Sequence, residues 1–580
     1  MRALNEKKEP PHDRMNAITR PFLVLLLWLA AVPFAAAQAA PFRYDLLNLL
    51  PDDFAFCVVM HDLRGHADRW ERSDWLKGFR ASPLARTLFE TAEIQQLKKV
   101  QADLKKHFDV DWPTLRDDIL GDTLILAYTP GAKNQPNDER GFLLLHARKP
   151  ERLHDLIEKF NNVQIKSKEL KSVDELRYKG EAYQRRNQGS KTQFYYLKDA
   201  LAVFTFKEEQ IKAFLDRRAA SAKESPWAKR FEKAGADQAF VALCVNPRML
   251  DAELLQNSKK DDALPSYWRA LDAIFVTLAI HDDAELRLSI QADAERLPKW
   301  ARSVFTQTIP PSSLWQHFPE ESILTIATQT DFAGAADALK LLMPAQDQKK
   351  MASSWQGGLG AILRIDLFKD LLPNIGPDWG VCVLPSKDAR RLPEVMVALA
   401  VKPGSKEPPV DQALLKAVEF FAQIAVLDHN KNRPGALLRL QSVMQDKVEV
   451  KYLAGDKVFP PGIAPAYALK DGFLLFASSP ETIGKFKARE KKAAARKETP
   501  LIRLSTQELA RLLEHRREHV LAGLADRQQM SPDQATQNLE NVIAFLKLFD
   551  RATLSQHGDA GQASWIVRLS PRTSRPPRAD

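Results

Sequence analysis

The residues with the clearest potential for chemistry are the two histidines and the glutamate of the segment His515–His519, which reads His-Arg-Arg-Glu-His. This H-x-x-E-H spacing is the inverted signature of zinc peptidases. On a helix His515 and His519 would lie one turn apart on the same face, and Glu518 could act as the base for a zinc-bound water. The motif therefore raises the hypothesis of a zinc-dependent hydrolase.

The surroundings of this motif favour a solvated, charged helix face instead. Arg511, Arg516 and Arg517 lie in or beside it, and their positive charges would oppose a divalent cation. The corresponding place in the first of two repeats described below, Met249–Asn257, holds no histidine. A five-residue motif without further context is a weak indication of a metal site. We therefore expect no metal and no other cofactor, and the zinc site remains the alternative.

The other histidines show no spacing that suits a metal. His61 and His66 flank Asp62 near the first predicted strand, and without further ligands at metal spacing we expect a surface loop there. His281 and His557 occupy corresponding places at two predicted hairpin turns, which indicates turn chemistry rather than catalysis.

Motifs for other chemistries are missing from the sequence. No G-x-S-x-G elbow, P-loop or dinucleotide fingerprint occurs, and Gly357–Gly360 lacks the Lys-Ser/Thr pair that a phosphate cradle needs. Cys57, Cys244 and Cys382 each lie in an apolar, strand-like run. We expect them to be buried small hydrophobic residues, without a disulfide framework.

Residues 1–39 have the three parts of a secretory signal. Met1–Arg20 is polar and basic, Pro21–Phe34 is apolar, and small residues then allow cleavage after Ala37 or Ala39. An uncleaved N-terminal membrane anchor is the alternative, although the apolar stretch is short against the ~20 residues that span a bilayer. We expect an exported protein, periplasmic or extracellular, that contacts a membrane only through this segment.

The charge of the chain excludes few partners. Its 84 basic residues nearly balance 74 acidic ones, so the net charge of +10 is a weak signal. The basic run Lys485–Lys497 could contact lipid headgroups, but its cations spread around a predicted helix and leave little apolar face, so we expect a solvated helix. Nucleic acid is not an expected partner, because export removes it and no stacking aromatic residues are interleaved with the cations.

The chain is organised around a segment that occurs twice, at Tyr195–Phe214 and at Tyr467–Phe486. Each copy predicts a strand, a tight Lys-Asp turn, a second apolar strand and a helix. The copies align without a gap and share the residues Tyr195, Leu197, Lys198, Asp199, Phe204, Glu209, Ile211 and Phe214. Such self-similarity indicates an internal repeat.

The elements before and after these segments follow a common order. In the first half the predicted strands include Phe54–Met60, Thr123–Tyr128, Phe142–Ala147 and Ala239–Val245, with a closing hairpin of Ile274–Ile280 and Glu285–Gln291. Helices are predicted over Pro83–His107, from Pro113, and from Pro150 with the apolar face Leu153, Leu156, Ile157 and Phe160. In the second half the strands are Ser322–Ala327, Trp379–Leu384 and Val395–Val401, followed by a helix with Val410, Leu414, Val418 and Phe421 on one face.

We therefore predict an α+β fold made of two tandem copies of one mixed unit, each with antiparallel hairpins and packed helices. The predicted boundaries are 1–39 for the signal, 40–295 for the first repeat, 296–317 for a linker, 318–570 for the second repeat and 571–580 for a disordered basic tail.

Three short motifs carry a family resemblance: Leu50–Asp53 before a strand, the turn Leu120–Asp122 and the hairpin Leu197–Asp199. They resemble a broad family of exported bacterial proteins that is classed as a domain of unknown function and opens with Leu-Pro-x-Asp. The resemblance implies export and an α+β fold, and it transfers no catalytic residues. In the second copy Glu320–Glu321 and Pro377–Asp378 depart from the pattern.

The function expected from the sequence is that of a non-catalytic cell-envelope protein. The two copies share turn and core residues, such as Lys198, Asp199 and Phe204, but no set of acids and bases. Duplicated binding scaffolds have this character, with an envelope protein, a glycan or a lipid as the partner. The alternative is the zinc-dependent hydrolase or peptidase introduced above, and the sequence leaves the oligomeric state open.

Overall fold

The structure is a computed structural model. It describes residues 41–572 apart from 83–84, 86–88, 90, 132–137, 190, 221–224, 256–262, 298, 335–346, 348, 351–352, 355–365, 367–369, 387, 389–390, 405–406, 489–496 and 529. The predicted signal, Gly357–Gly360, most of the basic run and residues 573–580 of the predicted tail therefore lie outside the described residues.

The chain divides into two compact units. Of the described residues, those within 41–253 and 273–286 form unit 1, and those within 254–272 and 287–572 form unit 2. Both mix helices with strands, and every strand pairing is antiparallel, so the predicted α+β class is confirmed. None of the helices in the described ranges is long and apolar enough to cross a membrane.

Unit 1 contains the following elements. Its strands are β1 (Phe56–His61), β2 (Thr123–Thr129), β3 (Arg140–His146), β4 (Ser172–Tyr178), β5 (Glu181–Gln188), β6 (Lys191–Lys198), β7 (Leu201–Thr205), β8 (Val241–Val245) and most of β9 (Leu271–Ile280). Its helices are α2 (Tyr44–Leu47), α3 (Leu63–Arg72), α4 (Asp74–Ala81), α6 (Ala92–Phe108), the π-helix η1 (Thr114–Ile119), α7 (Pro150–Lys166), α8 (Glu208–Ala219), α9 (Pro226–Lys233) and the short 3₁₀ helices η3 (Ala236–Gln238) and η4 (Pro247–Leu250). The short helix α10 (Asp251–Leu255) crosses the boundary between the units.

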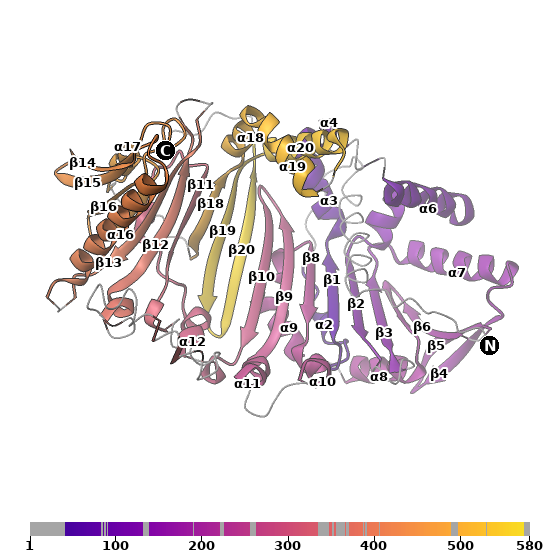
Figure 1. Cartoon of the computed structure of the whole chain (residues 1–580). Helices are drawn as coiled ribbons and strands as arrows, with labels where there is room; N and C mark the ends of the chain where they lie inside the picture. The colour runs from indigo at the N-terminus through magenta and orange to yellow at the C-terminus, as the bar shows by residue number, and fades with distance from the viewer. Residues whose placement is uncertain are drawn as a thin grey trace, which may run out of the picture. The chain divides into compact units, whose positions relative to one another are not determined.

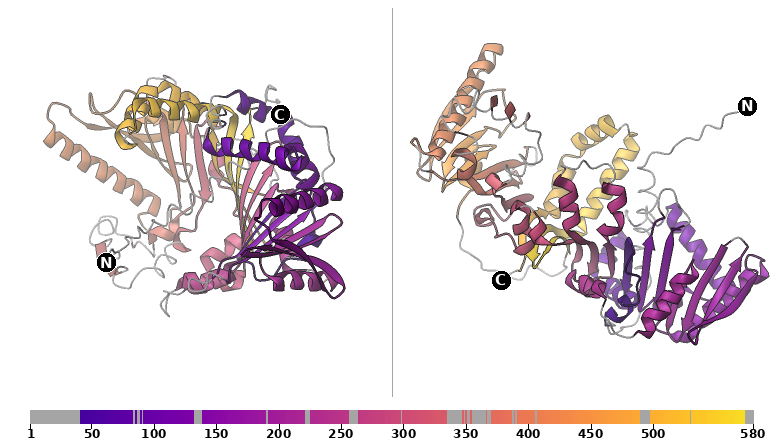
Figure 2. Two further views of the ribbon diagram at one scale, coloured as in Figure 1. Left: turned by 90° about the vertical axis from the view of Figure 1, so that its right-hand side faces the viewer. Right: turned by 90° about the horizontal axis from the view of Figure 1, so that it is seen from below.

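The strands of unit 1 lie side by side in the order β4-β5-β6-β7-β3-β2-β1-β8-β9 (Figures 1 and 2). One face of this sheet packs on α2, α8 and α9 through large buried side chains such as Phe142, Phe214 and Phe231. The other face packs on η1 and α7, where Leu145 and Leu153 are buried. Alternate residues of a strand point to opposite faces, so helices cover both sides of the sheet.

Unit 2 contains the remaining elements. Its strands are most of β10 (Ala284–Ala292), then β11 (Leu324–Gln329), β12 (Ile375–Leu384), β13 (Glu394–Val401), β14 (Arg439–Gln445), β15 (Val448–Ala454), β16 (Ala466–Lys470), β17 (Phe473–Ala477), β18 (Thr499–Ser505), β19 (Phe549–Asp559) and β20 (Gln562–Pro571). Its helices are α11 (Ala263–Ala270), η5 (Ala294–Arg296), α12 (Lys299–Thr306), η6 (Ser313–Gln316), η8 (Leu372–Asn374), α16 (Val410–Asn432), α17 (Pro480–Gly484), α18 (Thr506–His515), α19 (Arg517–Gln528) and α20 (Pro532–Lys547).

The strand order in unit 2 is β10-β20-β19-β18-β11-β12-β13-β17-β16-β15-β14. Its main core contains residues of η6, of the strands β11, β12, β13, β15, β16 and β17, and of α17, and it also includes Phe318 and Phe486. A smaller core between α18 and α20 contains Ala510 and Leu539.

The duplicated segment folds in both places as a hairpin followed by a helix, as predicted. In unit 1 these elements are β6, β7 and α8, and in unit 2 they are β16, β17 and α17. The turns use Asp199 with a φ of +52° and Asp471 with a φ of +53°. Aspartate tolerates this left-handed region better than most residues, which explains why an Asp follows the Lys in each copy.

Two predictions about local structure are wrong in detail. The helix predicted over Pro83–His107 is not continuous, because α6 begins only at Ala92, after the extended residue Thr91 (φ −65°, ψ 150°). His557 lies within β19, because the turn that follows is formed by Ala560 and Gly561 at positive φ. The predicted linker 296–317 contains α12 and η6.

Candidate functional site

The H-x-x-E-H motif does not lie on one continuous helix. The helix α18 ends at His515 and α19 begins at Arg517, with Arg516 between them in a turn conformation (φ −103°, ψ 16°). Arg517 in addition forms an ion pair of 2.6 Å with Glu540 of α20. Among the residues that the structure describes, no group of three or more His, Cys, Asp or Glu side chains is placed to hold a metal ion. His515 and His519 therefore belong to two successive helices, α18 and α19, rather than to one.

The surface loop predicted for His61, Asp62 and His66 is wrong, because all three residues are buried, with exposed fractions of 3%, 1% and 5%. His61 ends β1 and Asp62 caps α3, so the chain passes from strand to helix without a loop. Burial lowers the pKa of His66 to about 3, and its ring lies 5.6 Å from the ring of Phe240. His66 is thus a neutral packing residue at physiological pH.

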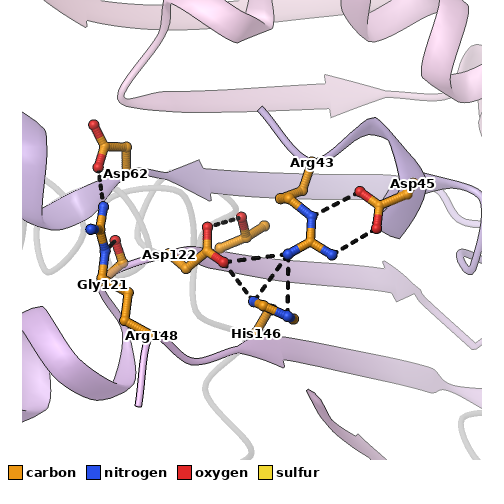
Figure 3. A network of polar contacts seen from close by, with 8 residues as sticks. Arg43, Asp45, Asp62, Gly121, Asp122, His146 and Arg148 are labelled. Carbon is orange, nitrogen blue, oxygen red and sulfur yellow. Dashed lines mark hydrogen bonds and ion pairs between the residues drawn. The ribbon is translucent and has the colours of Figure 1, made fainter. Parts of the chain in front are cut away.

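A network of charged side chains joins the ends of β1, β2 and β3 in unit 1 (Figure 3). Arg148, just after β3, donates from Nη2 to Asp62 Oδ1 at 2.5 Å and from Nε to the carbonyl oxygen of Gly121 at 2.9 Å. Asp62 also accepts a hydrogen bond from the backbone of Gly65 in the first turn of α3. Arg148 and Asp62 therefore tie the start of α3 to the turn before β2.

The second part of the network is centred on Asp122 (Figure 3). Its Oδ2 lies 2.5 Å from Nδ1 of His146 and 3.5 Å from Nη1 of Arg43, while Arg43 forms a two-pronged pair with Asp45. Burial of Asp122 raises the pKa of its carboxyl, but the hydrogen bond from His146 and the charges of His146 and Arg43 together bring that pKa below its usual value. The imidazole of His146 is thus held between a carboxylate and a guanidinium, an arrangement that fixes the strand ends in place.

A cavity in unit 1 lies on the sheet face covered by α6, η1 and α7. Its volume is about 670 Å³. Helix residues in its wall are Leu104, Phe108, Leu115, Ile119, Leu120, Leu153, Leu156, Ile157 and Phe160, and strand residues include Leu126, Leu143, Leu145 and Phe204. This volume lies within the ~300–1,000 Å³ that is typical of small-molecule sites, which are mostly apolar with a few polar groups.

The apolar wall of this cavity follows from the helical spacing predicted for the segment after Pro150. Pro150 starts α7 in its first turn, where its missing N–H costs no hydrogen bond. Residues three and four apart then share one face, so Leu153, Leu156, Ile157 and Phe160 all line the cavity. Phe160, Leu126 and Phe206 of the wall are 39%, 46% and 59% exposed, so the cavity is open to solvent.

One end of the cavity is polar and contains Arg186 of β5, which is only 5% exposed. Its guanidinium donates to the amide oxygens of Gln193, at 2.7 Å, and Gln164, and it lies 5.1 Å from the centre of the Phe160 ring. Burial lowers the pKa of Arg186, although an arginine remains charged at any physiological pH. The cavity thus combines an apolar wall with one buried positive charge.

Sequence reasoning did not single out Arg186. The run Arg185-Arg186 in β5 gives no sign of which arginine is buried, and the neutral partners of Arg186 come from α7 and β6. The apolar face of α7 was predicted correctly, but its pattern is the same for a filled core and for a cavity wall.

Comparisons with known proteins do not assign the chain to a family. No protein-family model matches the sequence, and no curated protein matches it either.

Proposed function

We propose that this chain is an exported, non-catalytic binding protein of the cell envelope, and that the cavity of unit 1 takes up a lipid-like ligand. Export is supported by the signal-like segment at residues 1–39. The binding role rests on one observation, the apolar cavity of about 670 Å³ between the sheet and the helices α6 and α7. Filling it with a ligand would remove its leucine and phenylalanine side chains from water.

The order of the strands supports the further proposal that the two units are divergent copies of one ancestor. Nine strands of unit 1 follow the order β4-β5-β6-β7-β3-β2-β1-β8-β9, and in unit 2 the order β14-β15-β16-β17-β13-β12-β11-β18-β19 repeats it with every number raised by ten. The shared residues of Tyr195–Phe214 and Tyr467–Phe486 fall on equivalent strands in this scheme.

We favour the binding role over the zinc-hydrolase alternative, because α18 ends inside the H-x-x-E-H motif. The network around Asp122 and His146 is likewise interpreted as structural, since each charged group in it faces an oppositely charged or hydrogen-bonding partner.

The binding proposal is tested by titrating the purified secreted form with Nile red, an uncharged dye whose fluorescence rises in apolar surroundings. We expect saturable binding with about one site, which a Leu126→Glu variant abolishes because it places a carboxylate at the cavity wall. Leu126 is 46% exposed, so this change should leave the fold intact. The matched control is Leu427→Glu on α16, which is 70% exposed, lies outside the cavity and should bind the dye normally. Equal binding by both variants would refute the proposal.

A further inference from the structure

The buried arginine at the polar end of the cavity has no acidic partner in the described part of the chain. Arg186 forms hydrogen bonds with two glutamine side chains and a cation–π contact with Phe160, and none of its described contacts is an ion pair. Its Nε is buried and has no hydrogen-bond partner. Other arginines of unit 1, such as Arg148 and Arg185, face aspartates.

An uncompensated charge at this depth is costly. Transfer of a cation out of water costs several kcal/mol, and neutral hydrogen-bond acceptors repay only part of that cost. An anion that enters the cavity would supply the missing opposite charge in surroundings of low dielectric constant, where the attraction is strong. The described side chains around Arg186 thus leave its positive charge without an opposite charge, and an anionic group would supply one.

Further polar side chains lie beside Arg186 in the wall of the cavity. Gln188 donates to the Gln164 amide oxygen at 3.3 Å, which is the same oxygen that accepts from Arg186. Asn161 donates to the Tyr195 hydroxyl at 3.1 Å, while its own Oδ1 is buried without a partner. Unpaired donor and acceptor atoms therefore lie on the same polar end of the cavity, next to an apolar wall.

We propose that the ligand is an amphiphile with a single-charged carboxylate head, bound with its carboxylate at Arg186 and its hydrocarbon chain along the leucine and phenylalanine wall. This inference rests on the proposed function and specifies its ligand class. A guanidinium matches the geometry of a carboxylate with paired N–H donors. A phosphate monoester carries about two negative charges at pH 7, and Arg186 is the one cationic side chain among the described residues that line this cavity, so the carboxylate is the better match.

The experiment compares three probes of equal chain length, dodecanoate, dodecanol and dodecyl phosphate, by calorimetric titration of the secreted form below their micelle concentrations. We expect dodecanoate to bind most tightly. The variant Arg186→Gln should weaken dodecanoate at least ~30-fold, about 2 kcal/mol, and change dodecanol less than ~3-fold. The variant Arg186→Lys keeps the charge but loses the planar fork, and should give an intermediate affinity.

The matched control is Arg185→Gln, one residue earlier on β5. Arg185 points to the opposite face of the strand and pairs with Asp174 at 2.8 Å, so its removal should leave all three affinities unchanged. Circular dichroism of each variant checks that it is folded, and Arg186→Gln should fold because it removes a buried charge that has no acidic partner.

The outcomes separate this inference from the proposed function. If dodecanol binds as tightly as dodecanoate and Arg186→Gln changes neither, the cavity binds lipids and the carboxylate inference is refuted. If dodecyl phosphate binds more tightly than dodecanoate, and this binding depends on Arg186, the carboxylate inference is also refuted and the ligand carries a phosphate head group. If none of the probes binds, both the inference and the proposed function fail.

Discussion

Replacing Asp122 with asparagine should destabilise unit 1 in a way that depends on pH. Asp122 is 9% exposed, and its carboxylate contacts Nδ1 of His146 at 2.5 Å, Nη1 of Arg43 at 3.5 Å and Oγ1 of Thr123 at 3.3 Å. Asparagine keeps the shape but removes the charge. A hydrogen bond to a charged group contributes roughly 1.5–3 kcal/mol, so we expect Asp122→Asn to lower the free energy of unfolding by about 2 kcal/mol at pH 7.

The sign of the pH dependence follows from the pKa of Asp122, which the fold lowers below its usual value. An aspartate in the unfolded chain has a pKa of about 3.9. The carboxylate therefore stabilises the folded state fully above that pH, and the contribution is lost as the pH falls through the lower pKa of the folded state. The difference between the wild type and Asp122→Asn should be constant from about pH 5 to 7 and should shrink below about pH 4.

The assay is guanidinium denaturation followed by circular dichroism, with linear extrapolation at a series of pH values. The matched control is Asp109→Asn at the end of α6, where the side chain is 78% exposed and pairs with the exposed Lys105. Asparagine also tolerates the left-handed conformation of this position, so no measurable change is expected. An Asp122→Asn variant that is as stable as the wild type at pH 7, or whose deficit persists unchanged at pH 3, would contradict the reasoning.

Three further predictions concern the core, a thiol and a turn. Phe214→Ala and Phe486→Ala remove fully buried side chains at corresponding positions of the similar segments Tyr195–Phe214 and Tyr467–Phe486, so each should lower the unfolding free energy by about 3–5 kcal/mol in denaturant titrations, and a much smaller loss at either would contradict its role in the core. Burial raises the pKa of Cys382 to about 11, so iodoacetamide at pH 8 should leave it unmodified until denaturant is added, and rapid labelling of the native protein would contradict this. Ala560→Gly should raise the unfolding free energy by up to about 1 kcal/mol, because Ala560 has a φ of +44°, and a lower melting temperature would show that the turn is not strained.

The sequence predicts those parts of the fold that depend on local patterns. The hairpin and helix at Tyr195–Phe214 and the start of α7 at Pro150 were predicted from periodicity and turn residues, and the structure contains both. Burial of Cys57, Cys244 and Cys382 was likewise predicted from their apolar neighbours and is confirmed. These features are encoded within a few neighbouring residues, so one sequence suffices to predict them.

The features that were predicted wrongly or missed depend on contacts between segments that are distant in the sequence. His61 and His66 were expected in a surface loop because no further ligands at metal spacing accompany them, but α3 begins directly after β1 and both residues are buried. The burial of Arg186 in the cavity involves contacts with Gln164 and Phe160, which belong to α7 rather than to β5. A helix break at a single residue, as at Arg516, also has no clear sequence signal, because arginine is a good helix former.

The packing of α6 bears on how fast a bound molecule can leave the cavity of unit 1. Among the described side chains of α6, Phe108 at its end packs against a core cluster, while Val100 in its middle is 48% exposed. Segments with few buried contacts open locally at much lower free energy than the whole domain unfolds. Because Leu104 and Phe108 form part of the cavity wall, we expect the rate at which a bound molecule leaves to follow the opening of this single helix. Residence time would then be tuned by substitutions on α6 that leave the equilibrium stability of the sheet unchanged.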